Sequence, residues 1–215
     1  MKEGLGGSVS IFLRLSNAKD RIQFILNKNG FDRIPIKQPS LQYSGLIAAP
    51  VRYEIAQKNN VMIRYNPERY LLDAVGSLDD IITTIDDLIK AFENLGYDLE
   101  DMTRYLEFNT HLEEGIETTM ASFFEKQVEL GSLNKIGNLL KEEKLSVFQL
   151  HLSNSISPLH DNWLSFRINP DINSNKIVFI KVTKRTETFK AMIDFLTNFN
   201  TRFDEIVSIL GEDGL

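Results

Sequence analysis

The sequence predicts an α+β protein: antiparallel sheet(s) formed by two related β-hairpin/helix halves, with long helices packed on one face. Three observations carry this prediction. Two alternating segments flank a short Asn-rich turn, which is typical of a β-hairpin. Two long segments have apolar residues at helical spacing. One short motif, Arg-x-Asn-Pro-acid, occurs twice.

The hairpin is predicted from Val51–Ala56 and Val61–Tyr65, because both segments alternate between apolar and polar residues. Asn59 and Asn60 lie between them. Asparagine tolerates the positive φ angles that tight hairpin turns require, so these two residues favour a turn at this point.

The clearest predicted helix runs from Ser77 to Leu95. Ser77 is a suitable N-cap, Asp79 and Asp80 stand in the first turn where the helix dipole favours acids, and Gly96 follows the last apolar residue. A second long helix is predicted from Thr186 to about Leu210, and its apolar face is rich in phenylalanine.

The remaining elements are predicted from shorter patterns. Arg21–Asn29 is expected to form a helix that Gly30 ends, whereas Val9–Leu15 is compatible with a strand or a helix. Alternation predicts four further strands, at Thr103–Leu112, Ser146–Leu152, Trp163–Ile168 and Lys176–Thr183.

These elements divide the chain into four parts that we expect to form one compact unit. They are a basic N-terminal segment (1–50), a first α+β half (51–115), a helical bridge (116–145) and a second α+β half (146–215).

The doubled motif relates the two halves. Residues 63–68 (IRYNPE) match residues 166–171 (FRINPD) at an offset of 103 residues. In both places a predicted strand leads into Arg-x-Asn-Pro-acid and an amphipathic helix follows further along. Proline lacks a backbone donor and restricts the residue before it, so Asn-Pro is expected to end each strand.

Two interpretations of the motif remain open. The favoured one is structural: the Asn side chain fixes a turn, and the motif marks a strand end in a duplicated scaffold. In the functional interpretation the two motifs converge on one binding site for a small anionic ligand, which the arginines would hold. The candidate site residues are Arg64, Asn66, Glu68, Arg167, Asn169 and Asp171.

Composition excludes several classes of protein. The 215 residues contain no cysteine, which excludes disulfides, thiolate metal sites and a cysteine nucleophile. No signal peptide and no membrane-spanning stretch of roughly 20 apolar residues is visible, so a cytoplasmic protein without membrane contact is expected. The three histidines have no metal-ligand spacing, and no nucleotide-binding loop occurs, so we expect no metal and no cofactor.

The charge is unevenly distributed. Residues 1–70 contain 11 Lys and Arg against 5 Asp and Glu, although the whole chain has a net charge of −6. The favoured interpretation is that this basic segment docks on the acidic remainder of its own or a sister chain. A nucleic-acid contact is the less favoured alternative, because the cations are scattered and the whole protein would repel a polyanion.

Three functions follow, in order of preference. The first is a non-catalytic binding or assembly protein that self-associates as a homodimer, because the Phe-rich final helix has more apolar surface than one small sheet was expected to cover. The second is a small-molecule-binding protein or an enzyme that uses a cleft between sheet and helices. The third is nucleic-acid contact through the basic N-terminal third.

Overall fold

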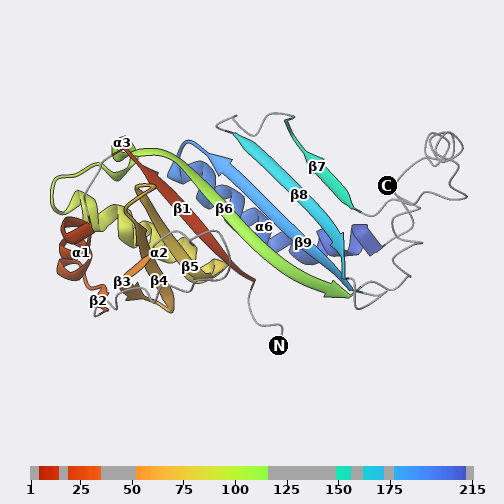
Figure 1. The fold of residues 1–215 in the computed structure, drawn as a ribbon, viewed down its shortest axis with the longest axis horizontal. Helices are drawn as coiled ribbons and strands as arrows, with labels where there is room; N and C mark the ends of the chain where they lie inside the picture. The colour runs from red at the N-terminus through yellow and green to blue at the C-terminus, as the bar shows by residue number, and fades with distance from the viewer. Residues whose placement is uncertain are drawn as a thin grey trace, which may run out of the picture.

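The computed structural model describes residues 5–14, 19–34, 52–115, 149–155, 162–171 and 177–211. They form an α+β fold with one large antiparallel sheet of nine strands, in the order β2-β3-β4-β5-β1-β6-β9-β8-β7 (Figure 1). The predicted class and the antiparallel pairing are therefore confirmed.

The strands alternate in direction across the whole sheet, and each pairs with its neighbours in an antiparallel register. Their bounds are β1 Gly6–Leu13, β2 Asp32–Arg33, β3 Tyr53–Lys58, β4 Val61–Asn66, β5 Leu71–Ser77, β6 Thr103–Gly115, β7 Leu150–Ser153, β8 Trp163–Pro170 and β9 Ile177–Thr186.

The order of the strands shows a recurring arrangement. β1 pairs with the last strand of the β3-β4-β5 meander, and β6 pairs with the last strand of the β7-β8-β9 meander. A long helix follows each meander, and β1 and β6 pair with each other at the centre of the sheet. The β1–β6 pair thus joins the two meanders into one continuous sheet.

Four helices are described: α1 Lys19–Lys28, α2 Leu78–Glu93, α3 Leu99–Met102 and α6 Phe189–Gly211. α2 contacts β4, β5 and β1, whereas α6 contacts β6 and β9, and the two helices contact each other. Both lie behind the strands in the view of Figure 1. α1 packs beside α2 and against β2 and β3.

The core lies between the strands and these helices. On α6, Phe189, Met192, Leu196, Phe199 and Phe203 are at most 5% exposed. Phe195 and Phe199 both contact the ring of Phe108 on β6. These five residues of α6 are therefore buried against the sheet and α2 of their own chain, whereas Ile193 and Phe195 are only partly buried.

Lys184 is the basic residue on the helix-facing side of β9. Its ammonium group lies 5.8 Å from the ring centroid of Phe195 and contacts the side-chain oxygen of Asn162. Burial lowers the pKa of Lys184 below its ordinary value of 10.5, because removal from water disfavours the charged form.

Most of the locally predicted elements are confirmed. Ser77 caps α2 by accepting from the amide of Asp80, and Asn59 and Asn60 have φ angles of 49° and 62° in the β3–β4 turn. Gly30 has φ 79° after α1. The ambiguous segment near Val9 forms β1, and the predicted bridge at 116–145 lies outside the described residues.

Two expectations about the halves need correction. β5 was not predicted, because Leu71, Leu72, Asp73 and Ala74 are all buried and so do not alternate. In addition, β8 does not end at Asn169, since Asn169 and Pro170 still pair with β9. A proline at the last position of a strand removes only a donor that the ladder no longer requires.

Candidate functional site

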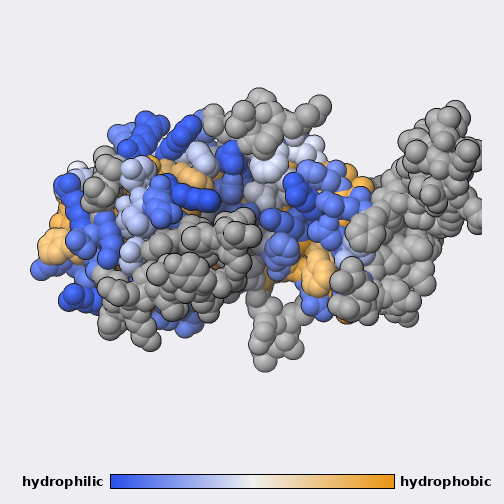
Figure 2. All heavy atoms as spheres, viewed as in Figure 1, coloured by the Kyte–Doolittle hydropathy of each residue, from blue (hydrophilic) through white to orange (hydrophobic). Residues whose placement is uncertain are grey.

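One side of the sheet faces away from α2 and α6, and we call it the open face. Alternation along the strands places Ser10 of β1, Glu107 of β6 and Lys181 of β9 on it, whereas Val9, Phe108 and Val182 face the helices. Figure 2 views the molecule from this side and shows mainly hydrophilic residues over β6, β9 and β8.

A groove of about 570 Å³ follows β1 along the open face. Its floor is formed by β1 and its two neighbours in the sheet, and its ends reach the β4–β5 turn and the middle of β9. The lining residues are Gly6, Gly7, Ser8, Ser10, Phe12, Arg52, Arg69, Leu71, Val75, Glu107, Asn109, Thr110, His111 and Lys181.

Basic side chains stand at both ends of this groove. Arg69 belongs to the β4–β5 turn. It lies two residues before Leu71, which pairs with Phe12 of β1. Lys181 and His111 pair with each other near the opposite end, where Gly6 accepts a hydrogen bond from the hydroxyl of Thr110. The two ends are roughly 20 Å apart, because β1 rises about 3.3 Å per residue between Gly6 and Phe12.

The acids of this region are paired inside the chain. Glu107 accepts from the guanidinium of Arg185 at 2.6 Å, and the two side chains are 19% and 16% exposed. Asp73 is buried next to the groove, accepts from the hydroxyl of Ser10 at 2.5 Å, and lies 3.5 Å from the guanidinium of Arg52. Arg69 and Lys181 have no carboxylate partner among the described residues.

Aromatic rings on the open face are also engaged. The rings of Phe12 and Tyr105 stack at 4.1 Å. The guanidinium of Arg185 lies 4.6 Å from the ring centroid of Tyr105 and 5.8 Å from that of Trp163. The indole N–H of Trp163 donates to the hydroxyl of Ser153. These contacts hold Arg185 beside Glu107.

Four basic or imidazole side chains form a straight line across the strands, which we call the cationic row. His111 of β6 pairs with Lys181 of β9, Lys181 pairs with Arg167 of β8, and Arg167 pairs with His151 of β7. Directly paired residues share a face of the sheet, so all four belong to the open face. Lys181 belongs to both the row and the groove.

The first predicted motif forms a turn. Asn66 is buried, and its side-chain oxygen accepts from the amides of Glu68 and Arg69. Arg64 donates to the carboxylate of Glu54 at 3.2 Å. Asn66 thus holds the backbone of Arg69, the residue that reaches the groove, while Glu68 is exposed.

The second motif is placed differently. Arg167 belongs to the cationic row, Asn169 pairs with Phe179, and the amide of Asp171 donates to the carbonyl of Ile177. Four strands separate β4 from β8, and the two strands run in opposite directions. The two turns therefore lie at opposite ends of the strands, and β4 and β8 are roughly 24 Å apart across the sheet.

The sheet thus brings together neither the two arginines nor the two asparagines. Binding by either motif alone remains a prediction, in which Arg167 is the member that faces an open surface with another cation beside it. Sequence patterns did not single out Arg69, Lys181 or Arg52. Position 69 directly follows the first motif, which is the only local indication of its role.

The site offers one pairing that resembles a catalytic dyad. Nε2 of His151 lies 2.8 Å from the hydroxyl oxygen of Ser165, but Ser165 is only 3% exposed. A hydroxyl that a substrate cannot reach does not serve as a nucleophile. Among the described residues no group of three His, Asp or Glu is placed to hold a metal ion.

Several described cations of the N-terminal third, unlike Arg69, are engaged with carboxylates or aromatic rings of their own chain. Lys58 pairs with Asp87 of α2 at 2.9 Å and Arg52 with Asp73, which joins basic residues before position 70 to acids after it. Lys19 and Arg21 lie over the rings of Tyr53 and Tyr97. Of the helices in the described ranges, none combines the length and the apolar character that crossing a membrane requires.

No protein family model, no curated protein and no solved structure matches this chain. Its function therefore has to be inferred from the geometry of the open face.

Proposed function

We propose that the protein is a non-catalytic binding protein that holds an anionic ligand in the groove of the open face. The observation that supports this most directly is the pair of groove cations, Arg69 and Lys181, that have no carboxylate partner in the described part of the chain. Glu107, the acid of the lining, is already neutralised by Arg185. A groove with this balance favours a negatively charged ligand.

An enzyme is the second candidate and has less support. Ser10 of the groove donates to the carboxylate of Asp73. Ser165 contacts His151, but its side chain is buried. Catalysis by a serine requires a base beside an accessible hydroxyl. Neither the hydroxyl of Ser10 nor that of Ser165 meets both conditions.

Nucleic-acid contact through the N-terminal third is the least supported alternative. A polyanion is bound by clustered cations, whereas Lys19, Arg21 and Lys58 are each engaged with a ring or a carboxylate elsewhere in the chain. We include three further points in the proposal. The protein is located in the cytoplasm, its two halves are related by duplication, and its long helices cover only one face of the sheet. The recurring order of strands supports the duplication.

The groove is tested with two small anions, citrate and inorganic triphosphate, by isothermal titration calorimetry at low ionic strength. Each anion is shorter than the groove and contacts the cation at one end. The double variant Arg69→Gln/Lys181→Gln removes both possible contacts and is expected to weaken binding at least about tenfold, because a hydrogen bond to a charged group contributes about 1.5–3 kcal/mol. Binding is also expected to weaken as salt is raised, since salt screens exposed charges.

The matched control is Arg64→Gln. Arg64 carries the same charge on a neighbouring strand, but it pairs with Glu54 and does not line the groove. It should leave the affinity for both anions within about twofold. If neither anion binds the wild-type protein, or if Arg64→Gln weakens binding as much as the double variant, the groove is not the binding site.

Self-association remains a separate prediction with a weaker basis than the sequence indicated. Five apolar residues of α6 are buried within the chain, whereas Ile193 and Phe195 are partly exposed. The apolar surface that the helix leaves for a homodimer is therefore smaller than the sequence predicted. Sedimentation velocity at high micromolar concentration decides the matter, because a single species of about 24.6 kDa would contradict the prediction.

A further inference from the structure

The cationic row continues beyond the groove to the edge of the sheet. It starts at His111, passes through Lys181 and Arg167, and ends at His151 on the outermost strand of the order. Neighbouring strands lie about 4.8 Å apart, so the row is about 14 Å long. Lys181 and Arg167, its two permanent charges, have no carboxylate partner among the described residues.

We propose that the cationic row binds an acidic α-helix of a partner protein, laid across strands β6, β9, β8 and β7. The inference rests on the proposed function, because Lys181 belongs to both the groove and the row. It goes further in naming the class of partner. The anionic group in the groove would then be an acidic residue or terminus of that partner.

The spacing of the row favours a helix over an extended segment. Acidic residues at i, i+4, i+7 and i+11 lie on one side of a helix and span about 16 Å, which is close to the 14 Å of the row. Four residues on one face of an extended strand span about 20 Å. Long Lys and Arg side chains compensate a difference of about 2 Å more readily than one of about 6 Å.

The surroundings of the row favour a protein over a small molecule or a nucleic acid. The row beyond Lys181 lies outside the groove, so a small molecule there would remain largely in water. Single-stranded nucleic acid is held by bases stacked on aromatic rings. Here Tyr105 already contacts Phe12 and Arg185, and the chain has a net charge of −6.

The test uses a helical peptide with Glu at i, i+4, i+7 and i+11 on an Ala- and Gln-based helix. Binding is followed by the fluorescence of a label on the peptide, with the emission of Trp163, the single tryptophan of the chain, as a second readout. A peptide of the same composition with its glutamates distributed around the helix is the peptide control. We expect the aligned peptide to bind about tenfold more tightly.

Arg167→Gln is the decisive variant, since Arg167 belongs to the row and not to the lining of the groove. It should weaken the aligned peptide about tenfold and leave citrate binding unchanged. Lys190→Gln, an exposed lysine on α6, should change neither. Equal binding of the two peptides, no effect of Arg167→Gln, or tighter binding of an oligothymidine that also depends on Arg167 would each overturn the inference.

The two proposals fail in different ways. If citrate binds and depends on Arg69 while the aligned peptide does not bind, the groove stands and the helix partner is excluded. If neither citrate nor triphosphate binds to the wild-type protein, the proposed function itself is wrong.

Discussion

Replacing Phe108 with alanine is expected to lower the free energy of unfolding by about 3–5 kcal/mol. The ring is fully buried on β6 and contacts Phe195 and Phe199 of α6, with centroids 6.0 and 5.9 Å away. Its removal leaves a cavity between the sheet and the helix, in addition to the lost apolar burial. Chemical denaturation with urea measures the change.

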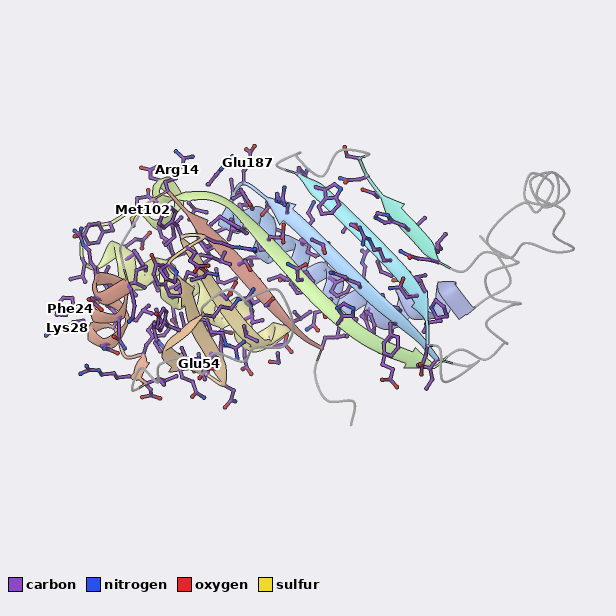
Figure 3. The ribbon with its side chains drawn as sticks, in the orientation of Figure 1. Arg14, Phe24, Lys28, Glu54, Met102 and Glu187 are labelled. Atoms are coloured by element: carbon purple, nitrogen blue, oxygen red, sulfur yellow. The ribbon has the colours of Figure 1, made fainter. Side chains whose placement is uncertain are left out.

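Phe24→Ala is the matched control for this variant. Phe24 lies on α1, is 55% exposed, and is labelled at the outer end of the molecule in Figure 3. Its loss should change the free energy of unfolding by no more than about 0.5 kcal/mol. A similar cost for the two substitutions would show that α6 does not pack on the ring of Phe108.

Gly7→Ala is expected to destabilise the protein by about 1–3 kcal/mol, because a methyl group has no room at this position of β1. A Cβ atom on Gly7 would lie 2.6 Å from Cε2 of Phe108 and 3.2 Å from the carbonyl oxygen of Asn109. The neighbouring Gly6 provides the control, since a Cβ atom there meets only the carbonyl oxygen of Gly76 at 3.8 Å. Gly6→Ala should therefore cost less than about 0.5 kcal/mol.

A double-mutant cycle identifies the atom responsible. If the ring of Phe108 causes the clash, Gly7→Ala should cost markedly less in a Phe108→Leu background, and the two changes should not be additive. Additive costs, measured by urea denaturation of all four proteins, would assign the strain to the backbone of Asn109 instead.

Local patterns predicted those elements whose stability is local. The spacing of apolar residues in α2, its cap at Ser77 and the turn at Asn59 and Asn60 can all be recognised within a few residues of sequence. β5 could not be recognised in this way, because Leu71–Ala74 are all buried. A strand that is buried on both faces does not alternate between apolar and polar residues. The pattern there gave no indication of a strand between the hairpin and the helix.

The sequence predicted part of the candidate site, but the roles it assigned to those residues differ from the roles that the structure indicates. The doubled motif drew attention to Asn66 and Arg167, and both are close to the binding surface that we propose. Their roles differ, however: Asn66 fixes the backbone of Arg69, whereas Arg167 presents its own charge in the row. A motif fixes the local conformation of a turn, but it carries no information about which end of the sheet that turn will occupy.

Patterns along the chain were thus sufficient for the class of the fold, the two long helices, most of the strands and the repetition of a strand-turn motif. Pairing in three dimensions was needed to place β1 at the centre of one sheet and the two motifs at opposite ends of its strands. The same pairing brings Arg69, Glu107 and Lys181 into the lining of one groove. The physical reason is the same in each case: periodicity reports the neighbours of a residue along the chain, whereas pairing across strands depends on register between segments that are distant in sequence.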